Sequence, residues 1–94
     1  MTHLKKILEL SEQQIQKKIT TQLEKDGYLV LKLIKCNKSG YPDLLAVKEN
    51  DTLFIEVKKP NGKLSELQKV RIADMKQRGI NVVVWTAYKQ DFKI

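Results

Sequence analysis

With 94 residues, the chain is long enough for one domain with a modest core, about residues 11–86, and little room for a separate recognition module. Lys and Arg number 18 against 11 Asp and Glu, and the resulting net charge of +7 favours a polyanionic partner, of which nucleic acid is the usual one. The lone Cys36 excludes an intramolecular disulfide and a thiolate zinc site, and the lone His3 excludes histidine-based catalysis.

The N-terminal part of the chain carries helix signals. Residues 1–10 form a short amphipathic arm, and Ser11 and Gln14 then form a capping box that starts a helix. Apolar residues recur at i, i+4 and i+8 along this helix, and Gly27 is its stop signal. Residues 28–34 are typical of a first strand, which a polar, basic loop follows.

Two short apolar runs on either side of a polar tip at residues 48–51 predict a β-hairpin. A two-residue loop at Glu49-Asn50, or a four-residue loop over the whole tip, pairs residues whose numbers sum to 99. Both registers place Asp43 directly opposite Glu56, with Cβ atoms about 4.5–5.5 Å apart. A three-residue loop would instead put the two acids on opposite faces of the sheet.

Lys58 follows Glu56 by two positions on the same strand, so Asp43, Glu56 and Lys58 are expected to converge on one face. Two carboxylates at about 5 Å repel by roughly 3 kcal/mol at an effective dielectric constant near 20, so a proton, a lysine or a divalent cation must offset the repulsion. Oxygen-only ligands suit Mg²⁺ or Mn²⁺. An ammonium beside such a cation can orient a water or stabilise charge on a phosphate. An isolated E-x-K is more often an exposed sheet surface, but two motifs in register favour metal-dependent phosphodiester cleavage.

The C-terminal part predicts a helix and a last strand. Ser65 and Gln68 form a second capping box, and the helix is expected to end at Arg78. Residues 81–85 are a nearly unbroken apolar run, typical of a buried strand. The connection through the helix makes this strand parallel to the one that carries Glu56. The fold class is therefore α/β, in the order α-β-β-β-α-β, with a mixed four-stranded sheet flanked by helices.

Four features stay open on the residues alone. Glu12 lies on the buried edge of the first helix, where an acid also complements the helix dipole, so we interpret it as structural. Gln68 is explained equally well by capping and by a site facing inward. Gly40 lets the backbone turn sharply or pass close to a ligand. Residues 86–94 form a short helix or a partner-binding tail.

The order of elements and four motif blocks resemble the VRR-NUC family of the PD-(D/E)xK nuclease superfamily, which implies a restriction-endonuclease-like core. The blocks are Ser11-Glu12, Gly40-Tyr41-Pro42-Asp43-Leu44, Ile55-Glu56-Val57-Lys58 and Leu64-Ser65-Glu66-Leu67-Gln68. P-D and E-x-K are weak signals separately, but the four blocks in this order and spacing are specific.

The resemblance implies roles for particular residues. The metal, Mg²⁺ or Mn²⁺, would be bound by Asp43, Glu56, the backbone carbonyl of Val57 and, as an accessory acid, Glu12. Lys58 would be the catalytic lysine. Gln68 would position the lysine, the attacking water or a phosphate.

The function that the resemblance implies is a metal-dependent, structure-selective DNA endonuclease, acting on branched DNA such as Holliday junctions. The resemblance to stand-alone members of the family, which are commonly encoded by bacterial viruses, implies a small homodimer. A homodimer with two-fold symmetry presents two sites to a substrate with two-fold symmetry. No apolar run approaches a membrane span and the N-terminus has no signal-peptide core, so we expect a cytoplasmic protein. The alternative is a non-catalytic nucleic-acid-binding module on a nuclease-like scaffold, because positive charge explains binding without chemistry. A sequence-specific restriction enzyme is disfavoured because no residues remain for a major-groove reader.

Overall fold

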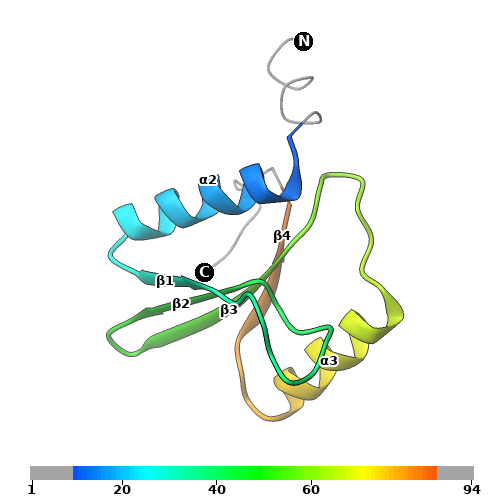
Figure 1. Cartoon of the computed structure of the whole chain (residues 1–94). Coiled ribbons are helices and arrows are strands. Elements are labelled where there is room, and N and C mark those ends of the chain that lie inside the picture. Colours follow the sequence, from blue (N-terminus) through cyan, green and yellow to red (C-terminus); the bar gives the residue numbers. More distant parts are fainter. Residues whose placement is uncertain (1–9, 87–94) are drawn as a thin grey trace.

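In residues 10–86, which are those that this computed structural model describes, two helices and four strands follow one another as α-β-β-β-α-β (Figure 1). The elements are α2 (Glu12–Lys25), β1 (Leu29–Lys32), β2 (Leu44–Lys48), β3 (Asp51–Val57), α3 (Glu66–Gln77) and β4 (Val82–Trp85). This is the predicted order. The predictions for the N-terminal arm, for His3 and for the segment after Thr86 lie outside the described residues.

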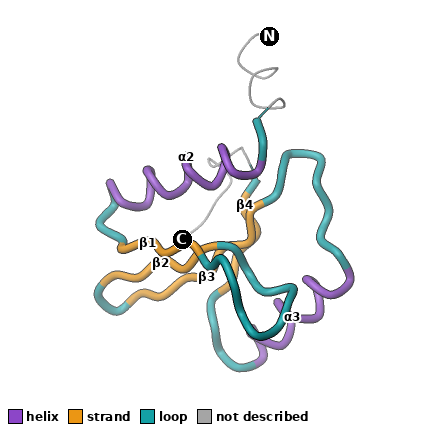
Figure 2. The backbone as a smooth tube through the Cα atoms, in the orientation of Figure 1, coloured by secondary structure: helices purple, strands orange, loops and turns teal. Residues whose placement is uncertain are grey.

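The four strands form one mixed sheet in the order β1-β2-β3-β4. The first three strands pair antiparallel, and β3 and β4 pair parallel, as the sequence predicts. Figure 2 shows the strands side by side, with α2 and α3 on opposite sides of them. Because successive residues of a strand face opposite ways, β3 contributes its odd-numbered residues to the α2 side and its even-numbered residues to the α3 side.

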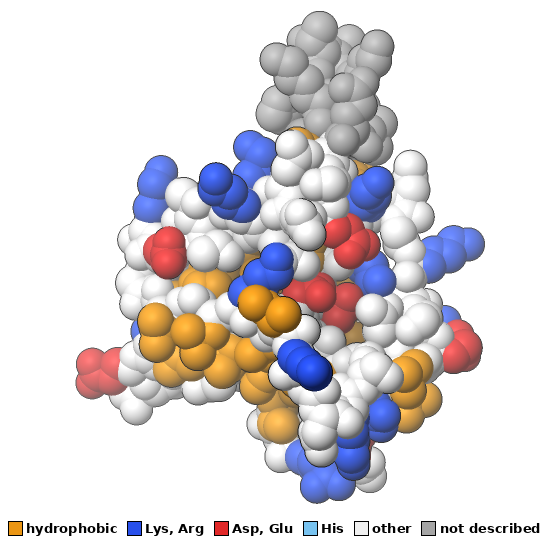
Figure 3. All heavy atoms as spheres, in the orientation of Figure 1, with side chains coloured by type: hydrophobic (Ala, Val, Ile, Leu, Met, Phe, Trp, Pro, Cys, Tyr) orange, Lys and Arg blue, Asp and Glu red, His pale blue; other side chains and the backbone are white. Residues whose placement is uncertain are grey.

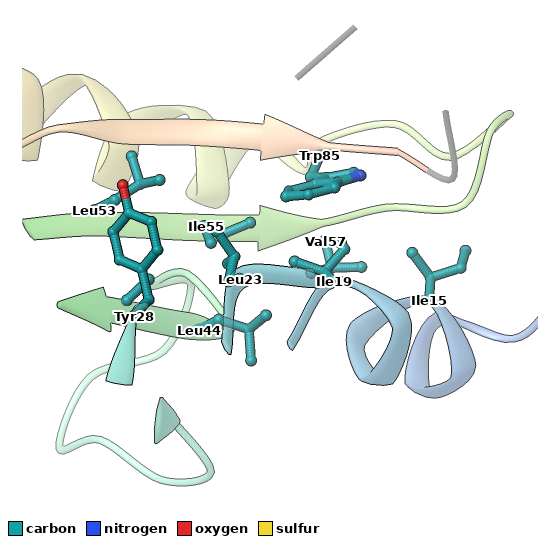
Figure 4. Packing of buried hydrophobic residues seen from close by; sticks show 10 residues of the cluster. Ile15, Ile19, Leu23, Tyr28, Leu44, Leu53, Ile55, Val57 and Trp85 are labelled. Atoms are coloured by element: carbon teal, nitrogen blue, oxygen red, sulfur yellow. The ribbon is translucent and has the colours of Figure 1, made fainter. Parts of the chain in front are cut away.

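The larger hydrophobic core lies between α2 and the sheet. Ile15, Ile19 and Leu23 recur at helical spacing and are at most 2% exposed, and they pack with sheet residues such as Ile55 and Trp85 (Figure 4). Full burial of each such aliphatic side chain contributes roughly 1.5–3 kcal/mol of hydrophobic free energy. This core holds α2 in place, and with it the acidic residue at its start.

The contact between α3 and the sheet is smaller. Ile72 and Met75 are its buried helix residues, and they pack with Val82 and against the half-buried Phe54. Val70, on the same helix, is 59% exposed. Hydrogen bonds from Gln68 to Glu56 and from Arg71 to Ser39 add to these few apolar contacts in positioning α3.

The β2–β3 hairpin has the predicted register. Its paired residues run from Leu44↔Ile55 to Lys48↔Asp51, so the connection is the two-residue loop Glu49-Asn50. Asn50 adopts a left-handed conformation with φ of 61°, which asparagine tolerates better than most residues. Of the three loop lengths considered, the two-residue loop is therefore the one observed.

The first strand is shorter than predicted, spanning Leu29–Lys32 in place of residues 28–34. At its start, Tyr28 turns into the core and its hydroxyl donates a hydrogen bond to Asp51. At its end, the pairing with β2 stops at Lys32↔Leu44 because the partner chain bends just before Leu44. Among the helices of residues 10–86, none is long and apolar enough to cross a membrane.

Candidate active site

Asp43 lies in the bend immediately before β2, and backbone hydrogen bonds hold it on both sides. Its N–H donates to Ile55 O at 3.0 Å, and its C=O accepts from Leu33 N at 2.8 Å. Its side chain is held as well, because Oδ2 accepts the Val57 N–H at 2.8 Å. The acid therefore has a defined position at the open end of the β2–β3 pair.

Glu56 faces the α3 side of β3 and is 2% exposed. One of its carboxylate oxygens, Oε2, accepts a hydrogen bond from Gln68 Nε2 at 3.1 Å and lies 3.7 Å from Lys58 Nζ. The other, Oε1, is buried and has no hydrogen-bond partner. The hairpin pairing ends at Leu44↔Ile55, and Ile55 O accepts the Asp43 N–H, so the ladder does not continue to the predicted pair of Asp43 directly opposite Glu56. Asp43 is nevertheless close enough for its charge to act on Glu56. An unpartnered buried carboxylate oxygen is costly unless a proton or a cation meets it.

The electrostatic surroundings of Glu56 also favour binding of a proton or a cation. Burial, and next the charge of Asp43, raise the pKa of Glu56 from 4.5 to about 7, and Glu12 adds to this effect. Lys58 acts in the opposite direction and lowers the pKa. The pKa of Glu56 remains raised despite Lys58, so the lysine does not fully compensate the burial and the neighbouring negative charges.

Asp43, Glu56, Lys58 and Gln68 are thus brought together, whereas Glu12 is not. Glu12 is the half-buried first residue of α2, close enough for its charge to act on Glu56. Within residues 10–86, however, no group of three His, Cys, Asp or Glu side chains is arranged to hold a metal ion. Among the described residues, no metal-binding group of acids includes Glu12, so its role as an accessory ligand remains a prediction.

The residues that do gather are suited to a hard divalent cation. The N–H of Val57 points to Asp43, and in an extended strand the C=O of the same residue points to the same side. The carboxylates of Asp43 and Glu56 and the Val57 carbonyl are therefore the oxygen donors available at this end of β3, and Glu56 Oε1 is the one without a hydrogen-bond partner. Mg²⁺ is commonly bound by one or two carboxylates, with water and substrate phosphate completing its ligands.

Gln68 takes part in both of the arrangements considered for it. Ser65 Oγ accepts the Gln68 N–H at 3.1 Å, and Gln68 Oε1 accepts the Ser65 N–H at 2.9 Å, which completes the capping box. The nitrogen end of the same carboxamide donates to Glu56. Capping and contact with the site are therefore made by opposite ends of one side chain.

Sequence reasoning missed Arg71, which fastens the basic loop to α3. Its Nε donates to Ser39 O at 3.0 Å, and its guanidinium lies 5.1 Å from the centre of the Tyr41 ring. Gly40 has φ of 89°, and a Cβ there would lie 2.7 Å from Leu67 Cγ. The close approach at Gly40 is therefore to α3. Nothing in the local sequence around Arg71 indicates this long-range contact.

The same loop borders a hollow of about 540 Å³ that includes Asp43 in its lining. Lys35 and Lys38 are among the other lining residues. On the face drawn in Figure 3, acidic side chains gather near the middle of the molecule with Lys and Arg side chains around them. The face therefore presents an acidic centre within a positively charged surround.

Comparison with known proteins identifies the family. The family model of the VRR-NUC domain matches residues 2–88. The chain belongs to the VRR-NUC family. A solved structure described as a VRR-NUC domain is 36% identical and superposes with a TM-score of 0.76, covering 84% of this chain and 87% of that one. No curated protein matches the chain. VRR-NUC domains belong to a nuclease superfamily, whose members usually use divalent metals, and DNA is the substrate that such a domain suggests.

Proposed function

We propose that this VRR-NUC chain is a divalent-metal-dependent endonuclease that hydrolyses phosphodiester bonds in DNA. One observation carries the proposal: a buried Glu56, with one oxygen unpartnered, sits beside a second acid and a lysine. Most buried side-chain polar atoms have a hydrogen-bond partner, so an oxygen without one at this depth calls for an explanation, and a bound cation supplies one. Together with membership of a nuclease family, the geometry favours catalysis over a scaffold role.

Each residue has a separate task in this proposal. When bound, Mg²⁺ or Mn²⁺ would neutralise the acids, polarise a phosphoryl oxygen and lower the pKa of a water. Asp43, Glu56 and the Val57 carbonyl would hold the ion. The Lys58 side chain is 14% exposed, so its ammonium can reach substrate. There it would orient the attacking water or stabilise the charge that develops on the phosphate oxygens.

The basic loop supports DNA as the substrate. Lys35 and Lys38 line the same hollow as Asp43, so a phosphate backbone drawn to these lysines would pass the proposed metal ligand. Phosphate contacts of this kind position a nucleic acid without reading its sequence. Selection by the shape of the DNA is the expected consequence.

We also propose branched DNA, such as a Holliday junction, as the preferred substrate of a homodimer. Resolving a junction needs two symmetric cuts, and a two-fold dimer supplies two sites. Leu29 and Leu31 on β1 are 61% and 45% exposed, and Figure 3 shows hydrophobic side chains exposed in the region of β1 and β2. Such an exposed apolar strand is a suitable surface for a second copy.

The decisive experiment compares labelled four-way junction, duplex, splayed-arm and single-stranded DNA, each with Mg²⁺, Mn²⁺ or EDTA. We expect metal-dependent cuts, with the junction preferred, that disappear in Glu56→Ala and Lys58→Ala while DNA binding persists. Glu49→Ala, at the exposed hairpin tip, is the matched control and should cut normally.

Cutting retained by both site variants would falsify the assignment of the site. Binding without cutting in either metal, and without any metal-dependent stabilisation, would instead favour the non-catalytic binding module. Positive charge alone accounts for that outcome.

A further inference from the structure

Both helices begin with the same capping box, but only one of the two adjoins the site. In α2, Ser11 N donates to Gln14 Oε1 at 2.9 Å; in α3, Ser65 N donates to Gln68 Oε1 at 2.9 Å. Gln14 is exposed, whereas Gln68 is half-buried against Glu56. The two boxes are therefore a natural pair for separating helix capping from an effect on the site.

A carboxamide has an acceptor at one end and donors at the other. The Ser65 N–H donates to the Gln68 oxygen, and this orientation places the nitrogen of the same carboxamide against Glu56. The reverse orientation would set a donor against the Ser65 N–H and an oxygen against a carboxylate. It would lose both hydrogen bonds and add repulsion.

The orientation of the amide decides which carboxylate oxygen of Glu56 remains free. With Nε2 facing the site, Oε2 is occupied by Gln68 and lies near Lys58. Oε1 is then the oxygen without a partner. Groups behind a metal ligand commonly orient it in this way.

We infer that Ser65 is a positioning residue: its backbone N–H orients the Gln68 carboxamide, which in turn leaves Glu56 Oε1 free to bind a cation. Only the last step rests on the proposed function. The orientation of the amide is a property of the protein without metal, and it can be measured as such.

Two substitutions at Ser65 separate the hydroxyl from the N–H. Ser65→Ala removes the hydroxyl cap and keeps the N–H. Ser65→Pro removes both, and its ring fits the observed φ of −70°. Ser11→Pro is the matched control, since Ser11 has φ of −74° and caps the other helix.

The first readout is the side-chain NH₂ signal of Gln68 in ¹⁵N-labelled protein in EDTA. The two NH₂ protons of a glutamine are distinct in any environment because rotation about the amide C–N bond is slow, so the informative quantity is their rate of exchange with water. We expect slow exchange in the wild type, in Ser65→Ala and in Ser11→Pro. In Ser65→Pro we expect rapid exchange, with circular dichroism confirming that α3 remains folded. Wild-type-like signals in a folded Ser65→Pro, or their loss in Ser65→Ala, would overturn the inference. If Ser65→Pro does not fold, the wild type and Ser65→Ala decide, because rapid exchange of the Gln68 NH₂ protons with water in either protein contradicts a held amide.

The second readout is the affinity for Mn²⁺, measured by calorimetry. Loss of a group that orients a ligand weakens metal binding by about 10- to 100-fold, and we expect this only in Ser65→Pro. An unchanged Mn²⁺ affinity in that variant would overturn the link to Glu56. If no variant, the wild type included, binds Mn²⁺, the proposed function fails while the NMR result still decides the orientation of the amide.

Discussion

Glu56 combines three properties that rarely coexist in a side chain without a function. It is buried, it lies among other acids, and one of its oxygens lacks a hydrogen bond. Each of these disfavours the charged form of the carboxylate. Lys58 reduces the imbalance without removing it. The acid is therefore kept at the expense of stability, as is typical of sites that bind a cation or transfer a proton.

This makes the stability of the metal-free protein depend on pH. Because folding raises the pKa of Glu56 from 4.5 to about 7, the folded chain binds more protons than the unfolded chain between these values. The free energy of unfolding should therefore fall as pH rises through that range, by an amount on the order of 3 kcal/mol. Above pH about 7, Glu56→Gln should be more stable than the wild type. Near pH 4.5, where the wild-type carboxyl is protonated in the folded chain, this difference should vanish.

Chemical denaturation in EDTA across this pH range would measure the effect. Glu49→Gln at the exposed hairpin tip is the control and should show no such pH-dependent difference. Adding Mg²⁺ or Mn²⁺ above the folded-state pKa should stabilise the wild type and not Glu56→Gln. A difference between wild type and Glu56→Gln that does not change with pH would contradict the raised pKa.

At the scale of the elements, polar contacts add to the apolar packing that joins α2 to the sheet. The Tyr28 hydroxyl, at the end of α2, donates to Asp51 at the start of β3. Lys48 Nζ lies 4.4 Å from the centre of the same ring and donates to Asp26 O. Burial, followed by the hydrogen bond to Asp51, raises the pKa of Tyr28 to about 12, so its hydroxyl remains a donor.

Tyr28→Phe should lower the free energy of unfolding by about 1.5 kcal/mol, because it removes a hydrogen bond to a charged group and keeps the ring. Urea denaturation would measure this. Asp51→Ala and the double variant complete a double-mutant cycle. The double variant should lose less unfolding free energy than the sum of the two single variants. Additive losses would show that the two side chains do not interact.

The basic loop before β2 provides a prediction about DNA binding. If Lys35 and Lys38 each contact a phosphate, replacing both with Ala should reduce the slope of log affinity against log salt by about 1.8 for duplex DNA. Lys25 and Lys76, in the last turns of the two helices, are the control pair and should leave the slope unchanged. Fluorescence anisotropy in EDTA measures binding without cutting. Equal slopes for both double variants would place the DNA elsewhere.

The hairpin and the helix starts were predictable because local signals determine them. Loop length determines register, so the pairing from Leu44↔Ile55 to Lys48↔Asp51 followed from counting residues. The direct opposition of Asp43 and Glu56 did not follow, because the chain bends at Asp43 and its N–H donates to Ile55 O. The capping boxes located both helix starts at Ser11 and Ser65. The contact of Gln68 with Glu56 was left open, because it depends on how α3 packs on the sheet.

Other features depend on contacts between residues far apart in the sequence. Arg71 reaches Ser39 across 32 positions, and no local pattern marks such a pair. The distance of Glu12 from Glu56 is set by the packing of α2 on the opposite side of the sheet from α3. The early end of β1 reflects the bend of its partner at Asp43, which residue preferences in β1 do not encode.

At the scale of the whole molecule, the surface combines positive charge with exposed apolar side chains. The net charge of +7 favours binding to a polyanion, while the exposed leucines of β1 favour contact with another protein surface. A homodimer would use both properties at once, covering the leucines while leaving two basic surfaces free. The proposed assembly therefore requires no change of fold.

Light scattering after gel filtration should give twice the chain mass of 10.9 kDa. Leu31→Lys should shift the mass toward that of one chain, because a charge in an apolar interface is costly. Val70→Lys introduces the same charge at a 59% exposed position on α3 and should not. A single-chain mass for the wild type at all concentrations would contradict the dimer.

The hydrogen bond from the Val57 N–H to the Asp43 carboxylate has a consequence for the evolution of the sequence. Asp43 serves as a tie between neighbouring segments of the sheet as well as a proposed ligand, so replacing it removes a fold contact and a chemical group together. Lys58 contributes a backbone N–H, which donates to Trp85 O and which most substitutions keep, and an ion pair with Glu56, which matters less once no cation has to be bound. Descendants that abandon cleavage are therefore expected to lose the lysine first and to retain the aspartate.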